Sequence, residues 1–278
     1  VLKVADLQTN FLLVVALVIA TPSYLLFGWL SDRIGRKPII VIGCALGALS
    51  ILPAFHALTA AANPALAMAQ RAAPVVVYAD PRACSVQFDP VGANQFDSSD
   101  CDIAKAMLSR AGISYRTVAL AAGARTQIHI GERTLSPPDP RGLAPAARAA
   151  RIAGFAVDAK AALATVGYPP AADPARVDSP AVIAIVVALL LLAAMTYAPT
   201  SAFLVELFPA RIRYTSLSVP YHLGTGWVGG LLPATAFAIV AANGNIYAGL
   251  WYPVFFCALS TIVALLFLPE TRGRPIEG

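Results

Sequence analysis

Hydrophobic residues along the chain gather in long runs that contain no Asp, Glu, Lys or Arg. These uncharged runs cover residues 7–31, 38–70, 179–205 and 214–269. About 20 apolar residues are enough for a helix to cross the hydrocarbon core of a bilayer. A charged residue at the centre of such a helix costs about 2.5–3.5 kcal/mol on insertion scales. The pattern therefore predicts membrane-spanning helices from which charge is excluded.

The last run is long enough for two crossings if the chain turns near residues 243–245. We therefore expect five spans, at residues 9–30, 39–60, 181–205, 217–241 and 249–268. The first span lacks the basic leading segment and the small-residue cleavage site of a signal peptide. Because the chain begins with Val1 rather than Met, we expect either a piece of a longer protein or an unusual start.

Basic residues lie in the short segments that follow the first, third and fifth spans. They are Arg33, Arg36 and Lys37, then Arg211 and Arg213, then Arg272 and Arg274. Lys and Arg accumulate on the cytoplasmic side of membrane proteins. This predicts a multi-pass protein of the inner (plasma) membrane, with the N-terminus and residues 71–178 outside and the C-terminus in the cytoplasm. An odd number of spans agrees with termini on opposite sides.

The composition agrees with a membrane protein. Hydrophobic residues make up 58% of the chain and charged residues 13%, against about 25% charged residues in soluble domains. The formal net charge of +5 does not indicate nucleic-acid binding. Residues 71–178 mix acids and bases, and the short loops that hold the remaining excess are explained by membrane topology.

The loop Gly28-x-x-x-Asp32-Arg33-x-Gly35-Arg36-Lys37 resembles the signature loop of the major facilitator superfamily. In that family the loop joins the second and third helices of each half. Two further stretches, ELFPARIRY at residues 206–214 and PETRG at residues 269–273, resemble the cytoplasmic ends of later helices. Their order is that of the last five of twelve helices. The details ELFPARIRYTS and NIYAGLWYP look most like the metabolite:proton symporter branch.

The resemblance implies an all-α polytopic membrane protein with a partial major facilitator fold and a small α+β extracytoplasmic insert. Residues 1–70 would hold the first two helices and the signature loop, residues 71–178 the insert, and residues 179–278 the last three helices. The implied function is the C-terminal part of a secondary active transporter, not an enzyme. It would move a small organic acid or zwitterionic metabolite with protons by alternating access. Its partners would be this substrate, the proton, the lipid bilayer and a missing N-terminal half, without a cofactor, a metal or nucleic acid.

By the same resemblance, the charged loops form a gating network on the inner face. Its candidate members are Gly28, Asp32, Arg33, Gly35, Arg36, Lys37, Glu206, Arg211, Arg213 and Glu270. Pairs between the acids and Arg36 or Arg213 across helix ends would latch this face in one state. Each pair at a wet interface contributes about 0–1 kcal/mol, which suits two states of similar energy. In the alternative interpretation these charges only set the topology.

His222 is the main polar candidate inside a span. An ionisable residue within a membrane is a functional hypothesis, and His titrates near neutral pH, so it would relay a proton or bind an anionic substrate. The alternative is a histidine bonded to a neighbouring helix. Tyr197 and Tyr221 would line a pore or simply pack. The stretch GTGWVGG at residues 224–230 lacks a preceding strand for dinucleotide binding, so we expect close helix packing there and at Gly43 and Gly47.

Residues 71–178 are too long for a plain connection, and their pattern predicts a folded segment. We expect strands at residues 74–79 and 113–120, a hairpin around Gly131-Glu132, and helices at residues 98–112 and 143–166. Ser98 or Ser99 would cap the first of these helices.

Cys84 and Cys101 both fall within this outer segment, where an oxidising compartment favours a disulfide. A faint similarity of residues 98–118 to a glutaredoxin leaves a redox role open, although the C-x-x-C motif is missing. Free thiols are the third alternative. The corresponding alternative function is a membrane-anchored extracytoplasmic binding or thiol-redox domain. A truncated product without activity is a further possibility.

Overall fold

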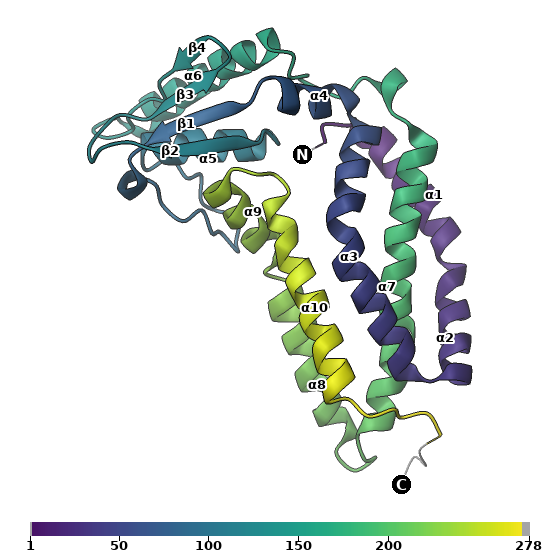
Figure 1. Ribbon diagram of the computed structural model, residues 1–278. Coiled ribbons are helices and arrows are strands. Elements are labelled where there is room, and N and C mark those ends of the chain that lie inside the picture. Colours follow the sequence, from purple (N-terminus) through teal and green to yellow (C-terminus); the bar gives the residue numbers. More distant parts are fainter. Residues whose placement is uncertain (1, 274–278) are drawn as a thin grey trace. The chain divides into compact units, whose positions relative to one another are not determined.

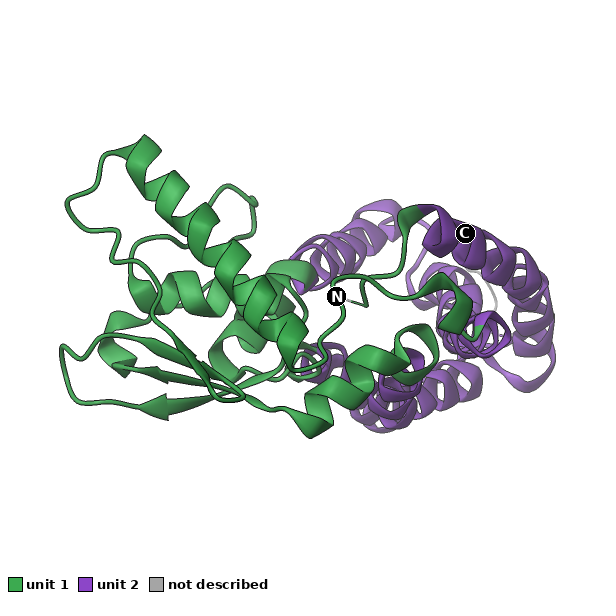
Figure 2. Cartoon of the chain, turned by 90° about the horizontal axis from the view of Figure 1, so that it is seen from above, with its two compact units in different colours: residues 1–6, 59–178, 233–249 green, residues 7–58, 179–232, 250–278 purple. Residues whose placement is uncertain are grey.

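The computed structural model describes residues 2–273, and within them the chain forms two compact units (Figure 2). Of the described residues, the helical unit comprises 7–58, 179–232 and 250–273, and the sheet unit comprises 2–6, 59–178 and 233–249. Arg274, one of the basic residues used to orient the chain, lies outside the described residues.

Five helical segments of the described chain are long and apolar enough to cross a membrane. They are Asp6–Ile34, Arg36–Ala62, Ser179–Leu207, Arg213–Asn243 and Ala248–Leu266. Each contains most of one predicted span. The prediction of an all-α membrane protein with five spans and a small α+β insert is therefore confirmed.

The spans are built from the helices α1 (Asp6–Ala20), α2 (Pro22–Ile34), α3 (Arg36–Ala62), α7 (Ser179–Leu207), α8 (Arg213–His222), α9 (Leu232–Asn243) and α10 (Trp251–Leu266). A π-helical turn, Leu223–Gly229 (η3), follows α8 directly. A proline begins α2, where its missing N–H has no intrahelical acceptor to satisfy.

Glycines allow α3 to approach its neighbours in the helical unit, where α2, α3 and α7 run alongside one another (Figure 1). A Cβ atom on Gly43 would lie 2.9 Å from side-chain atoms of Met195 and Thr196 on α7. A Cβ atom on Gly47 would lie 3.5 Å from the sulfur of Cys257 on α10. These contacts agree with the predicted close packing through small residues.

The stretch GTGWVGG behaves differently from the expected packing motif. It forms most of the π-helical turn, and the N–H of Gly230 donates to the carbonyls of Thr225 and Gly226 at 3.0 and 3.1 Å. The carbonyl of Gly226 occupies the place that a Cβ of residue 230 would take. A Cβ on Gly224 or Gly226 would have no atom of another described segment within 4 Å. These glycines therefore accommodate a wide helical turn, which the periodicity of the sequence did not indicate.

The sheet unit holds four strands, β1 (Val75–Ala79), β2 (Tyr115–Ala119), β3 (Gln127–Ile130) and β4 (Arg133–Leu135). Their order is β2-β1-β3-β4. β1 and β2 are parallel, whereas β3 pairs antiparallel with both β1 and β4. The helices of this unit are α4 (Pro64–Ala72), α5 (Asp100–Arg110) and α6 (Pro145–Thr165), with short 3₁₀ turns at Pro81–Ala83 (η1), Pro174–Arg176 (η2) and Ala248–Leu250 (η4). Apart from α4, the main strands and helices follow the predicted ranges.

The core of the sheet unit follows the alternation of β1. Val75, Val77 and Ala79 are fully buried, while the residues between them are partly exposed. They belong to one cluster with Leu108 of α5 and Ile128 of β3. Burial of such side chains supplies the main driving force for folding in water. Ser99 caps α5, since its hydroxyl accepts from the N–H of Asp102 at 3.0 Å.

The end of the fourth span also belongs to the sheet unit. The hydroxyl of Tyr115 donates to the carbonyl of Ala241 at 2.6 Å, and the N–H of Tyr115 donates to the carbonyl of Gly244 at 2.7 Å. Gly244 has φ +85°, a conformation that glycine adopts at little cost. A turn glycine therefore allows the connection after α9 to bond directly to the first residue of β2.

Candidate functional site: a charged cluster at the ends of four helices

The turn between α2 and α3 is built around Gly35. This residue has φ +112°, which L side chains rarely adopt. A Cβ atom at this position would also overlap the carboxylate of Glu270. Glycine is therefore needed both for the backbone conformation and for the close approach of the segment after α10.

Arg36, the first residue of α3, is the centre of the cluster. Its guanidinium forms an ion pair with Asp32 of α2, and a second one with Glu206 of α7, in which Nη2 lies 3.0 Å from Oε1. Its Nη1 also donates to the hydroxyl of Ser31 at 2.7 Å. The side chains of Arg36 and Glu206 are only 11% and 16% exposed, whereas that of Asp32 is 64% exposed. The Arg36–Glu206 pair is therefore the better shielded of the two.

Glu206 has a second donor. The hydroxyl of the buried residue Thr271 donates to Glu206 Oε2 at 2.6 Å. The Nε of Arg36 also lies 3.4 Å from the same oxygen. Hydrogen bonds to a charged acceptor are stronger than those between neutral groups. Glu206 thus joins the start of α3 to the segment that follows α10.

Glu270 binds the N-terminus of α3 through backbone groups. Its carboxylate accepts from the N–H groups of Arg36 and Lys37 at 2.9 and 3.1 Å, and from those of Thr271 and Arg272 at 3.0 Å each. Partial burial opposes ionisation of this carboxyl, but the four backbone donors outweigh it, so the pKa of Glu270 lies below its usual value. A carboxylate at this position also complements the positive end of the helix dipole.

Lys37 of α3 binds the C-terminal end of α10. Its ammonium group donates to the carbonyl of Leu265 in the last turn of α10 at 3.0 Å. The last carbonyls of a helix lack intrahelical donors, so a cation is favourable there. Together these contacts join α2, α3, α7 and α10 at one end of the helical unit. We call the group Ser31, Asp32, Arg36, Lys37, Glu206, Glu270 and Thr271 the charged cluster.

Several predicted network residues lie outside this cluster. Arg33 lies over the ring of Trp29 in its own helix, with its Cζ 4.1 Å from the ring centroid. Gly28 contributes only its carbonyl, which accepts from the Ser31 hydroxyl at 2.7 Å. Arg211 is exposed in the turn before α8.

Among the described residues, the structure pairs Arg213 with a backbone carbonyl and not with an acid. Its Nε donates to the carbonyl of Phe208 at 3.1 Å. The turn at residues 208–212 brings this carbonyl within reach, so Arg213 closes its own turn. Ser31 and Thr271 are the members that sequence reasoning missed. Their positions next to Asp32 and Glu270 were the only available signal.

The aromatic and histidine candidates lie on helix surfaces. Tyr197 and Tyr221 are 58% and 54% exposed, and His222 is also exposed. The rings of Tyr221 and His222 meet edge to face, with centroids 5.9 Å apart. Within the described chain, these side chains are available to lipid, to water or to further helices.

The predicted disulfide is present. Cys84 and Cys101 are bonded, with their Cα atoms 5.2 Å apart, and the bond joins the segment after β1 to the first turn of α5. Cys101 is fully buried. The alternative of two free thiols is therefore wrong for this pair. Cys44 and Cys257, in the spans, are free.

Within the described residues, the five apolar helices are those of a multi-pass membrane protein, and comparisons with known proteins find similarity to transport proteins. Residues 148–278 match the family model described as "Sugar (and other) transporter". A "Putative metabolite transport protein" of Haemophilus influenzae is 33% identical over 83 residues, which cover 29% of this chain and 17% of that protein. "Solute carrier family 2, facilitated glucose transporter member 8" of Mus musculus is 31% identical over 72 residues, or 26% of this chain and 15% of that protein.

The chain is thus similar to transport proteins over part of its length. Both relatives are transport proteins, in agreement with the prediction that the chain is not an enzyme. The matched stretch covers about a sixth of the length of each of these relatives. No solved structure matches the chain.

Proposed function

We propose that the chain is the C-terminal part of a secondary active transporter, and that the charged cluster is its inner-face latch. The observation that carries this proposal is the position of Arg36, which binds acids from two other helices while the backbone around it binds Glu270. If these residues only set the membrane topology, exposed positive charge would be sufficient. Here the positive charge is shielded, and acids from separate helices surround it.

The latch acts through alternating access. In one state the charged cluster joins the ends of α2, α3, α7 and α10, which closes the inner face. In the other state the helix ends separate, and water takes the place of the lost partners. A rocking motion of one half of a transporter against the other would make this change around a site near the middle of the membrane. The ion pairs favour the closed state without locking it, because each is balanced by hydration in the open state.

The substrate class we propose is a small organic acid or zwitterion that moves together with a proton, as in the metabolite:proton symporter branch. This rests on the stretches ELFPARIRYTS and NIYAGLWYP. The interiors of the five spans hold no Asp or Glu, so we assign the main proton-carrying carboxylate to an N-terminal half. His222, with Tyr221 and Tyr197, is the proposed contribution of this chain to the substrate or proton path. The proposed location is the inner (plasma) membrane, with the charged cluster in the cytoplasm.

The test measures substrate uptake by the complete transporter that contains this chain. The wild type is compared with the separate variants Arg36→Ala and Glu206→Gln. Removing one partner of a shielded ion pair costs about 3–5 kcal/mol when the other charge stays buried. We therefore expect uptake to fall about tenfold or more. Arg272→Ala is the matched control, because its side chain is exposed and only its backbone N–H contacts Glu270. Uptake is normalised to the amount of protein in the membrane.

Wild-type uptake by Arg36→Ala at equal protein levels would contradict the latch. An equal loss in Arg272→Ala would also contradict it, since positive charge of any kind would then explain the effect.

A second candidate is an extracytoplasmic binding or redox module for which the spans serve as an anchor. The separate core and the disulfide of the sheet unit favour this candidate. Deleting residues 75–175 from the complete protein separates the two proposals. Transport should remain largely intact if the spans carry the function, and the function should disappear if the sheet unit carries it.

A further inference from the structure

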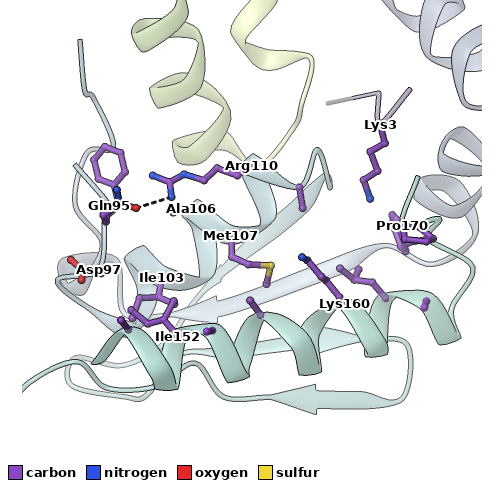
Figure 3. A pocket seen from close by; sticks show the side chains of 18 of the residues that line it. Lys3, Gln95, Asp97, Ile103, Ala106, Met107, Arg110, Ile152, Lys160 and Pro170 are labelled. Atoms are coloured by element: carbon purple, nitrogen blue, oxygen red, sulfur yellow. Dashed lines mark hydrogen bonds between the residues drawn. The ribbon is translucent and has the colours of Figure 1, made fainter. Parts of the chain in front are cut away.

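A cavity of about 820 Å³ lies within the sheet unit, lined by residues of α5 and α6 and by the N-terminal segment (Figure 3). Its walls are mainly apolar. Ile103 and Met107 come from α5, and Ile152 and Leu163 come from α6. Pockets of this volume, with apolar walls and a few polar groups, are typical of small-molecule sites. The charged cluster belongs to the other unit, so this cavity is a separate feature.

The charged groups at the cavity are mostly cations. Lys3, Arg110 and Lys160 line it, together with one acid, Asp97. Asp97 pairs with Arg148 at 3.5 Å, so its charge is already compensated. The hydrogen-bond acceptors of Arg110 are neutral, namely the carbonyl of Asn94 at 3.2 Å and the side-chain oxygen of Gln95 at 3.5 Å. The cavity therefore carries a net positive charge without a matching anion of the described chain.

The geometry of Lys3 shows that this cation is held in place. Its φ is +60°, an uncommon conformation for a residue other than glycine. Its ammonium group donates to the carbonyl of Pro169 at 2.9 Å, and its own carbonyl accepts from the N–H of Ala172 at 2.8 Å. Strained backbone persists only where the surroundings enforce it, and such strain is common at ligand sites.

Lys3 and Lys160 lie on the same side of the cavity in Figure 3. Partial burial and the nearby charge of Lys160 lower the pKa of Lys3. Within residues 2–273, Lys160 has no hydrogen-bond or ion-pair partner. Two ammonium groups near an apolar wall repel each other, and a bound anion would remove this repulsion.

We propose that this cavity binds an amphipathic monocarboxylate, with the carboxylate between Lys3 and Lys160 and the apolar part along Met107 and Ile152. The charge pattern selects an anion, and the walls select an apolar body. A polar sugar would place hydroxyl groups against apolar walls without hydrogen-bond partners, and a neutral hydrocarbon would leave the two ammonium groups without an anion. The proposal does not depend on transport, because it uses none of the residues of the charged cluster.

The experiment measures octanoate binding by isothermal titration calorimetry, with the full chain in lipid nanodiscs and with empty nanodiscs subtracted. Methyl octanoate is the uncharged comparison. We expect saturable binding of octanoate and about tenfold weaker binding of the ester, because only the acid offers a charged acceptor. The exposed residue Lys160 is the first target, since Lys160→Met removes a charge without removing a known contact.

The variant Lys160→Met should weaken octanoate binding about tenfold and leave ester binding unchanged. Lys3→Met with Lys160→Met should weaken octanoate binding further. Arg133→Met, on the exposed face of β4, is the charge-matched control and should bind octanoate as the wild type does. Ala156→Phe, which fills the cavity, should abolish binding of both ligands.

Three results would overturn the proposal. They are the absence of saturable octanoate binding to the wild type, equal affinity for the acid and the ester, and unchanged octanoate affinity in Lys160→Met. Unchanged octanoate affinity in Lys160→Met would itself require a folded variant, so a folding defect cannot account for the last result.

Discussion

The two units of the chain place their hydrophobic residues in opposite ways. In the sheet unit, Val77, Leu108 and Ile128 are fully buried. In the helical unit, Leu25 and Phe267 are 81% and 75% exposed, although they belong to a more hydrophobic segment of the chain. The sheet unit thus has the apolar interior expected of a fold in water. The helical unit has the apolar exterior expected of a fold in lipid.

The polar groups show the same contrast. Acids and bases are spread over the surface of the sheet unit, and most of its ion pairs are exposed. In the helical unit the charges are concentrated at the helix ends, where Arg36 and Glu206 are shielded. A charged side chain in the hydrocarbon core of a bilayer is costly, so charge remains only where the chain leaves the membrane. A concentrated, shielded set of charges at that position is available for gating, whereas scattered exposed pairs are not.

The largest expected effect is that of a core substitution in the sheet unit. Leu108→Ala should destabilise this unit by about 2–5 kcal/mol, because the transfer energy is lost and a cavity is left. The matched change Leu25→Ala in α2 should alter stability by less than about 1 kcal/mol, since the side chain faces outward. Hydrogen exchange of β1 and α2 amides in nanodiscs measures both effects. Equal losses of protection would show that the two units follow the same folding rule.

The disulfide should give the next largest effect. The bonded cysteines are 17 positions apart, and closing a loop of this size stabilises a fold by about 3 kcal/mol. We expect Cys84→Ser to increase exchange in β1 and α5 and to leave α3 unchanged. Cys44→Ser in α3 is the control. If Cys84→Ser changed neither β1 nor α5, the disulfide would have no stabilising role.

A smaller effect is expected for one contact of the charged cluster. Thr271→Val keeps the shape of the side chain but removes the donor to Glu206, at a cost of about 1.5–3 kcal/mol for a hydrogen bond to a charged group. Exchange at the amides near the start of α3 should increase, with no change in the sheet unit. Thr165→Val, in α6, removes a hydroxyl whose acceptor is a backbone carbonyl in its own helix, and it should leave α3 unaffected.

The smallest effect is the pH dependence of Glu270. Its pKa is lower in the folded protein than the ordinary value of 4.5, so the carboxylate stabilises the fold above that value. This contribution is lost as the pH falls through the lower, folded pKa. Amide exchange of Arg36 and Lys37, corrected for its intrinsic pH dependence, should therefore rise below about pH 4.5. Glu270→Gln should show no such step, and a step of the same size in this variant would assign the titration to another group.

Local patterns predicted the elements of both units. Runs without charge indicated the spans, and the alternation in VVVYA indicated β1, because side-chain burial follows the period of each element. The positions of Cys84 and Cys101 within residues 71–178, a segment expected to lie outside the cytoplasm, indicated the disulfide. In the charged cluster, the spacing of Asp32, Gly35 and Arg36 was sufficient to identify the turn.

Most contacts between distant residues could not be predicted from local patterns, and the Arg36–Glu206 pair was expected only from the family resemblance. Glu270 binds backbone groups of residues 36 and 37, and Lys3 reaches a cavity lined by α5 and α6. Both depend on the folded path of the chain and not on local spacing. The partner that Arg213 has in this structure was not predicted for the same reason, since its acceptor is a carbonyl that the turn at residues 208–212 supplies. Backbone groups give no sequence signal of their own.

The most direct test of the account is the accessibility of one exposed position in each unit to a membrane-impermeant maleimide in intact cells. Val91→Cys lies on the sheet unit and Arg211→Cys lies in the turn before α8, and both are made in a background with Cys44→Ala and Cys257→Ala. The account predicts that intact cells label Val91→Cys and that Arg211→Cys is labelled only after the membrane is permeabilised. Labelling of Arg211→Cys in intact cells would contradict the account.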